Sequence, residues 1–325
     1  MTKESANKRK KHEPVVKKPD VSQENVRLRR KPFYKSFKLQ KRMKHPGGPL
    51  PSSWKLTKKT LFLLRQNKRN LFTFVLIYAL LYLIFVRGFT TPVDIDGIRE
   101  GFKNVLARDL PPIIVNFSVV TLMLESATSA AGELQSLYQV MFYILGSLSL
   151  IWLFRQQQAG NEVTMKDAWY RGMYPLVPFS LLALLLVVQS FPASIGNFLV
   201  TAVFNNDLAV TVIEQVTWLF LFGLLLILSA YLMTTTVVAL FVSTLPEMTP
   251  KIALEKAKQM VKLRRMSIMR KIIGLATFLV IVFVAAVFPA IFVSAIFAQL
   301  VYFILTVLLL PYAVAYLFVL YRELL

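Results

Sequence analysis

The stretch that decides the fold is residues 271–322, KIIGLATFLVIVFVAAVFPAIFVSAIFAQLVYFILTVLLLPYAVAYLFVLYR, which carries no charged side chain between Lys271 and Arg322. A single α-helix over these 50 uncharged residues would be about 75 Å long. A bilayer core of about 30 Å needs only about 20 helical residues. The stretch therefore predicts two membrane-spanning helices, at about 272–298 and 301–321, with a turn near Gln299.

Four earlier segments also have the length and polarity of a crossing. They lie at about 71–89, 136–154, 174–195 and 216–244. With 56% apolar residues, the chain lies outside the usual composition of soluble domains. The sequence thus predicts an all-α polytopic transmembrane bundle of six spans within residues 51–325. Residues 1–50 are rich in Lys, Arg and Pro, and we expect them to form a disordered tail.

The cations are distributed unevenly. Of the 38 Lys and Arg residues, 22 lie in the first 70 residues, and the loop after the fourth span holds eight more. The turns after the third and fifth spans hold none. Because Lys and Arg accumulate in the cytoplasmic flanks of membrane helices, this alternation predicts a multi-pass plasma membrane protein with both termini in the cytoplasm.

One segment leaves the number of spans open. Residues 111–131 are apolar apart from Glu125 and have the length of a seventh crossing. Six spans are preferred, because a seventh would place the eight-cation loop outside the cell. Residues 87–135 then form an external segment. Its two carboxylates Asp94 and Asp96 are too few to predict a metal site.

A short phrase recurs in the two basic loops. Residues 163–169, VTMKDAW, and 248–254, MTPKIAL, both read apolar-Thr-x-Lys-x-Ala-apolar. Thr164 and Thr249 fit helix N-caps, and Pro250 fits the first helical position. The helix after Thr249 is amphipathic, so we expect it to lie flat on the inner leaflet, with these residues on its apolar face: Ala253, Ala257, Met260 and Val261.

A third copy of this short helix is less distinct. It would open at Ser53-Trp54-Lys55-Leu56-Thr57, with Trp54, Leu61 and Leu64 on a common face. The bundle is then either three repeats of a short helix and a two-helix hairpin, or two such repeats after an unrelated first part.

This pattern of a short surface helix leading into paired spans resembles several uncharacterised bacterial six-span families. It also looks like the membrane domain attached to some glycerophosphodiester phosphodiesterases. The resemblance covers about residues 50–325 and implies the six-span architecture. It transfers no catalytic residue, because the soluble phosphodiesterase domain has no counterpart in this chain.

The chain offers little reactive chemistry. It has no Cys, and its two His residues, His12 and His45, lie in the tail. Apart from Arg87 at the end of the first, the predicted spans contain no Asp, Glu, Lys, Arg or His, which disfavours a proton-coupled pathway. We therefore predict no catalytic residue, no cofactor and no metal site. The polar residues Gln189 and Thr234 to Thr236 would either line a substrate vestibule or pack between helices, and packing is favoured.

Two sets of residues are predicted to make contacts. Seven cations are expected to contact anionic lipids of the inner leaflet: Lys166, Arg171, Lys251, Lys258, Lys262, Arg264 and Arg265. Four small residues, spaced by four, are expected to mediate helix packing, within the chain rather than with a second copy: Ala286, Ala290, Ser294 and Ala298.

The partners of the tail are predicted from its charge. Anionic lipid is favoured, a protein partner comes second and nucleic acid last, because the tail carries few aromatic residues and is tethered to a membrane. The chain as a whole is predicted to be a non-enzymatic scaffold or regulator at the inner leaflet. The alternative is a transporter or permease subunit for an uncharged or lipid-like substrate.

Overall fold

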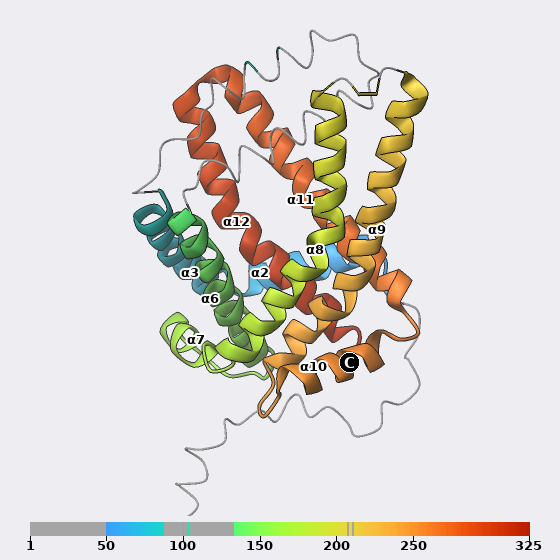
Figure 1. The fold of residues 1–325 in the computed structure, drawn as a ribbon. Helices are drawn as coiled ribbons and strands as arrows, with labels where there is room; N and C mark the ends of the chain where they lie inside the picture. The colour runs from blue at the N-terminus through green and yellow to red at the C-terminus, as the bar shows by residue number, and fades with distance from the viewer. Residues whose placement is uncertain (1–49, 88–99, 101–102, 104–132, 207, 210) are drawn as a thin grey trace, which may run out of the picture. The chain divides into compact units, whose positions relative to one another are not determined.

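The computed structural model describes residues 50–87, 100, 103, 133–206, 208–209 and 211–325. All of them belong to the compact unit Leu39–Leu325. Within these residues the chain forms nine α-helices and one π-helical turn, and no strand (Figure 1). The predicted all-α class is thus confirmed.

Six long helices form three hairpins. Helix α3 (Lys68–Tyr82), prolonged by the π-helical turn η1 (Leu83–Arg87), pairs with α6 (Glu133–Gln158). Helix α8 (Leu176–Asn205) pairs with α9 (Val212–Ser243), and α11 (Arg265–Val293) pairs with α12 (Ala295–Arg322). Among the described residues, six helices are long and apolar enough to cross a membrane, as predicted.

The long helices extend further than the predicted spans. The third candidate span runs over Leu176–Phe204, the second reaches Gln158 and the fifth begins at Arg265. These longer helices include charged residues that lie just outside the predicted spans, among them Arg155 in α6 and Lys271 in α11. Both side chains are buried, at 1% and 8% exposure.

Three short helices precede the hairpins. They are α2 (Ser53–Gln66), α7 (Met165–Gly172) and α10 (Pro250–Val261), and together we call them the short-helix belt. The predicted N-caps are confirmed: the Thr164 hydroxyl accepts from the Asp167 amide, and that of Thr249 accepts from the Ile252 amide. Pro250 begins its helix, as predicted.

Each short helix and the hairpin after it form one module, and the three modules pack cyclically. The closing helix of each module contacts the short helix and the first long helix of the next: α6 contacts α7 and α8, and α9 contacts α10 and α11. The third closing helix, α12, contacts α2 and α3 of the first module. The same contact is thus made three times, and the third closes the cycle.

Equivalent positions of the belt are buried in the same way. The N-caps are Ser52, Thr164 and Thr249. Four residues after each cap lie Leu56, Ala168 and Ala253, all at 0% exposure. Eight residues after each cap lie Thr60, Gly172 and Ala257, all buried. The first copy therefore exists: its helix begins at Ser53, as predicted, and its N-cap is Ser52.

A small aromatic cluster joins the closing helices. Each of these helices carries a Leu-Phe pair near its C-terminal end, at 153–154, 240–241 and 317–318. The Phe318 ring centroid lies 5.8 Å from that of Phe154 and 6.5 Å from that of Phe241. All three phenyl rings are buried. The modules therefore share a core at the end of the bundle where the belt lies.

The last hairpin turns earlier than predicted. Helix α12 is continuous from Ala295, so the turn lies at Ser294 and not near Gln299. The Ser294 hydroxyl caps α12 by accepting from the Phe297 amide over 3.1 Å. Ala290 and Ala298, at 2% and 0% exposure, therefore pack together from opposite arms of the hairpin. Ala286 is half-buried and Ser294 is exposed.

Several predictions fall on residues outside the described part of the chain. They concern the tail 1–49, the seventh crossing at 111–131 and the carboxylates Asp94 and Asp96. Of the predicted external segment 87–135, only Arg87, Glu100, Lys103 and the start of α6 are described.

Candidate functional site

The short-helix belt is the candidate functional site, and α10 shows how its residues are arranged. The apolar side of α10 packs against α9, with Ala253, Ala257 and Val261 almost fully buried. This differs from the expectation that the apolar side would rest on lipid. Three of the predicted cations, Lys251, Lys258 and Lys262, lie on the exposed side. Packing on α9 therefore turns the cationic side of α10 away from the protein.

Arg264 and Arg265 do not join that exposed set. The Arg265 guanidinium lies 3.5 Å from the centroid of the Tyr231 ring in α9. Its Nη2 and Nε donate to the Tyr231 main-chain carbonyl over 2.7 and 3.2 Å. Arg264 is half-buried. Arg265 thus anchors the start of α11 to α9, and this use of the side chain was not predicted.

The cations of α7 are exposed as well. Lys166 and Arg171 reach solvent, and the Arg171 Nε lies 3.9 Å from an Asp167 carboxylate oxygen. The Thr164 hydroxyl donates to the other Asp167 oxygen over 2.7 Å. This hydrogen bond, with the nearby charges of Arg171 and Lys166, holds the pKa of the Asp167 carboxyl below its ordinary value of 3.8. In its ionised form, the Asp167 carboxylate therefore holds the Thr164 side chain in place at the N-terminus of α7.

The exposed side of α2 combines cations with large apolar residues. Trp54, Leu61 and Phe62 are 68%, 53% and 71% exposed. Lys58 lies between them, and its Nζ is 5.6 Å from the Trp54 ring centroid. Leu61 and Leu64 belong to the predicted face, and Leu64 is half-buried. Aromatic and basic residues on one exposed side are typical of helices that lie in a membrane interface.

Two buried cations hold the modules together, and neither was predicted to do so. Arg155, the first residue after the predicted second span, donates to the Thr244 carbonyl and hydroxyl over 2.6 Å each, and to the Phe241 carbonyl over 3.3 Å. Lys271 donates to the Pro51 carbonyl, just before the cap of α2. A charge at the end of an apolar run looks the same in sequence whether it faces water or a neighbouring helix end.

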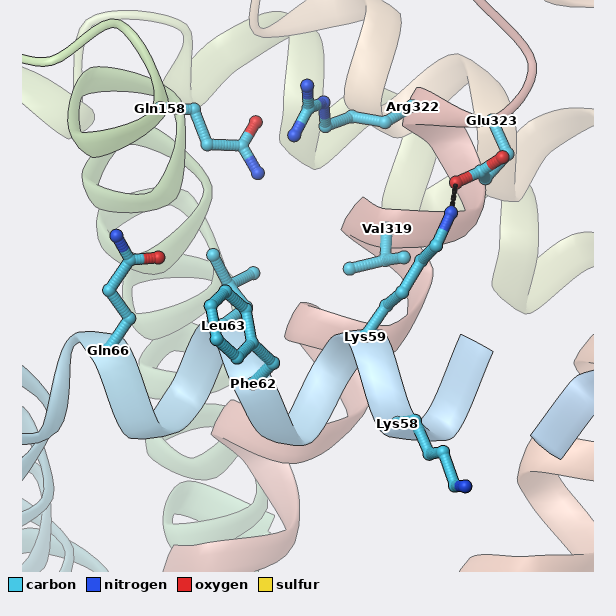
Figure 2. A pocket seen from close by; sticks show the side chains of 9 residues that line it. All are labelled: Lys58, Lys59, Phe62, Leu63, Gln66, Gln158, Val319, Arg322 and Glu323. Carbon is cyan, nitrogen blue, oxygen red and sulfur yellow. Dashed lines mark hydrogen bonds and ion pairs between the residues drawn. The ribbon is translucent and has the colours of Figure 1, made fainter. Parts of the chain in front are cut away.

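A pocket of about 600 Å³ lies where α2 meets the ends of α6 and α12 (Figure 2). Lys59 Nζ and the Glu323 carboxylate form an ion pair of 2.5 Å on one side of it. Gln158 of α6 and Arg322 of α12 extend toward one another across it. The other residues that line it are Lys58, Phe62, Leu63, Gln66 and Val319.

The polar residues proposed for a substrate vestibule do not form one. Thr234 and Thr236 are fully buried, and the Thr234 hydroxyl donates to the Ala230 carbonyl of its own helix over 2.7 Å. The Gln189 main-chain carbonyl accepts from the Ser229 hydroxyl, which joins α8 to α9. The Thr234 and Thr236 side chains are thus packed inside the bundle, the favoured prediction, and Gln189 is joined to α9 through its main chain.

No protein-family model matches the chain, and no curated protein and no solved structure matches it either. The class of protein accordingly follows from the fold itself. Six helices of sufficient length and hydropathy among the described residues make the chain a polytopic membrane protein. Within that described part, no group of three or more His, Cys, Asp or Glu residues is placed to hold a metal ion.

Proposed function

We propose that this protein is a scaffold at the inner leaflet of the plasma membrane, whose short-helix belt gathers anionic lipids. One observation carries the proposal: each belt helix packs its small or apolar positions on the closing helix of the preceding module. Each helix is then fixed in an orientation that keeps its cations exposed. They include Lys55, Lys58, Lys166, Arg171, Lys251, Lys258 and Lys262.

The charge distribution supports the cytoplasmic placement of the belt. The first belt helix, α2, lies within the first 70 residues, which contain 22 of the 38 cations, and such stretches resist translocation. In this orientation both termini are cytoplasmic. Each cation near an anionic leaflet contributes about 1 kcal/mol of attraction. A rigid array of cations would therefore concentrate anionic lipid around the bundle without any chemical step.

The transport alternative finds less support. Its best candidates for a substrate path, Thr234 and Thr236, expose none of their surface. The described part of the chain thus buries those hydroxyls within the bundle, where they offer no surface to a substrate.

The experiment uses the full chain in vesicles of zwitterionic lipid that contain a small fraction of dansyl-labelled lipid. Energy transfer from the four native Trp residues reports which lipid surrounds the protein. We expect stronger transfer to an anionic dansyl lipid than to a zwitterionic one, with a difference that shrinks as salt screens the charges.

The variant Lys251→Gln/Lys258→Gln/Lys262→Gln should reduce that difference. The matched control, Lys251→Arg/Lys258→Arg/Lys262→Arg, keeps the charge and should preserve it. Equal energy transfer to both lipids in the unmodified protein would overturn the proposed function.

A further inference from the structure

The residues that line the pocket between α2, α6 and α12 carry a net positive charge. Three cations line it, Lys58, Lys59 and Arg322, against the single carboxylate of Glu323. Lys59 is paired with that carboxylate (Figure 2). The Lys58 Nζ atom lies 5.6 Å from the centroid of the Trp54 ring. Within the described part of the chain, no hydrogen bond or ion pair joins the Arg322 guanidinium to another side chain. The Arg322 guanidinium can therefore bind an anion that enters the pocket.

The opposite wall offers an acceptor. The Gln158 Oε1 atom is buried and has no hydrogen-bond partner among the described residues. A buried amide oxygen that accepts no hydrogen bond has lost its bond to water without replacing it, which is unfavourable. Gln158 and Arg322 face each other across the pocket, so a ligand that fills it meets a guanidinium on one side and a hydrogen-bond acceptor on the other.

The remaining wall is apolar. Phe62, Leu63 and Val319 line the pocket between the polar groups. Phe62 continues into the exposed side of α2, where Trp54 and Leu61 also lie. A ligand that fits this pocket therefore has an anionic group, a hydroxyl group that donates a hydrogen bond, and an apolar part that extends along α2.

We propose that this pocket binds the phosphodiester headgroup of an anionic phospholipid that carries a headgroup hydroxyl. The Arg322 fork holds two phosphate oxygens, the geometry for which guanidinium is suited. The headgroup hydroxyl donates to Gln158 Oε1, and the glycerol and acyl chains lie along Phe62. The proposal builds on the proposed function, but it concerns a single stoichiometric site rather than the general enrichment of lipid.

The test measures phosphatidylglycerol bound to the full chain in detergent micelles by native mass spectrometry. Arg322→Gln and Gln158→Leu should each weaken the one tightly bound lipid about tenfold, which corresponds to about 1.4 kcal/mol. Arg69→Gln, which removes an exposed guanidinium outside the pocket, is the matched control and should bind like the unmodified protein. Because Arg322 is exposed, its variant should keep the melting temperature.

Two further ligands separate the sources of the phosphodiester. Phosphatidylcholine, which lacks the headgroup hydroxyl and the net charge, should bind more weakly. Glycerophosphoglycerol, the headgroup without acyl chains, should also bind more weakly, since it lacks the contact with Phe62. Equal binding of the free headgroup would overturn the assignment to a lipid, and unchanged binding in both pocket variants would overturn the site.

The outcome is independent of the vesicle experiment. If the pocket variants lose the bound lipid while no enrichment is seen in vesicles, the site stands and the scaffold function falls. If enrichment is seen and depends on the α10 lysines while the pocket variants bind normally, the function stands and the site falls.

Discussion

The guanidinium of Arg155 donates to the main-chain carbonyl of Thr244 over 2.6 Å and thereby joins the end of α6 to the end of α9. The last carbonyls of a helix have no partners within the helix, and the helix dipole places partial negative charge there. The buried Arg155 guanidinium therefore donates hydrogen bonds to carbonyls at the end of α9 and also offsets the partial negative charge there. It does so from a different module, next to the cluster formed by Phe154, Phe241 and Phe318.

Removing this cation should destabilise the bundle. Arg155→Gln loses the charge-assisted hydrogen bonds to Thr244 and Phe241, each of a kind that contributes about 1.5–3 kcal/mol. We expect a clearly lower melting temperature in detergent, whereas Arg65→Gln, at an exposed site on α2, should change it little. Equal melting temperatures for the two variants would contradict the role of Arg155 as a link between modules.

Gly172 marks a close approach between α7 and α6. A Cβ atom at this position would lie 3.1 Å from the Ser149 Cα atom and 3.2 Å from the Leu148 carbonyl oxygen. Because backbone cannot move aside cheaply, Gly172→Ala should cost about 1–3 kcal/mol. The control is Gly274→Ala in α11, where nothing lies within 4 Å of the added atom. Thermal unfolding of both variants measures the difference, and a neutral Gly172→Ala would refute the packing of α7.

Asp167 should make the stability of the protein depend on pH in the acid range. The hydrogen bond from Thr164 lowers its pKa in the folded state. The stabilisation is then fully present above the unfolded pKa of about 3.9 and is lost as the pH falls through the lower folded value. Asp167→Asn should therefore melt below the unmodified protein at pH 6, and the gap should close toward pH 3. A gap that stays constant would argue against the ionised cap.

The periodicity and the caps could be predicted from the sequence because both are local. Thr164, Thr249 and Pro250 act as expected, since a cap needs only its own first turn. The six long helices follow from uncharged length alone. The turn at Ser294 was missed because Ser294 lies in a continuous apolar run, and only its extended backbone and side-chain cap distinguish it.

The contacts between modules could not be predicted from a single sequence. Nothing local says that Arg155 reaches Thr244, or that Arg265 lies on the ring of Tyr231. The pocket escaped prediction for the same reason, because Phe62, Gln158 and Arg322 are far apart in the chain and meet only when α2 closes the cycle on α12. The lipid contacts of the belt remain a prediction.

Cysteine accessibility in intact cells would show directly whether the three belt helices lie on the cytoplasmic side of a six-span bundle. The chain has no Cys of its own, so single substitutions at exposed positions report one site each. They are Ser53 in α2, Lys166 in α7, Glu255 in α10 and Asn206 in the turn between α8 and α9. An impermeant maleimide should label Asn206→Cys, and should label the three belt variants only after the membrane is opened. Labelling of any belt position in sealed cells, or protection of Asn206→Cys, would contradict the account.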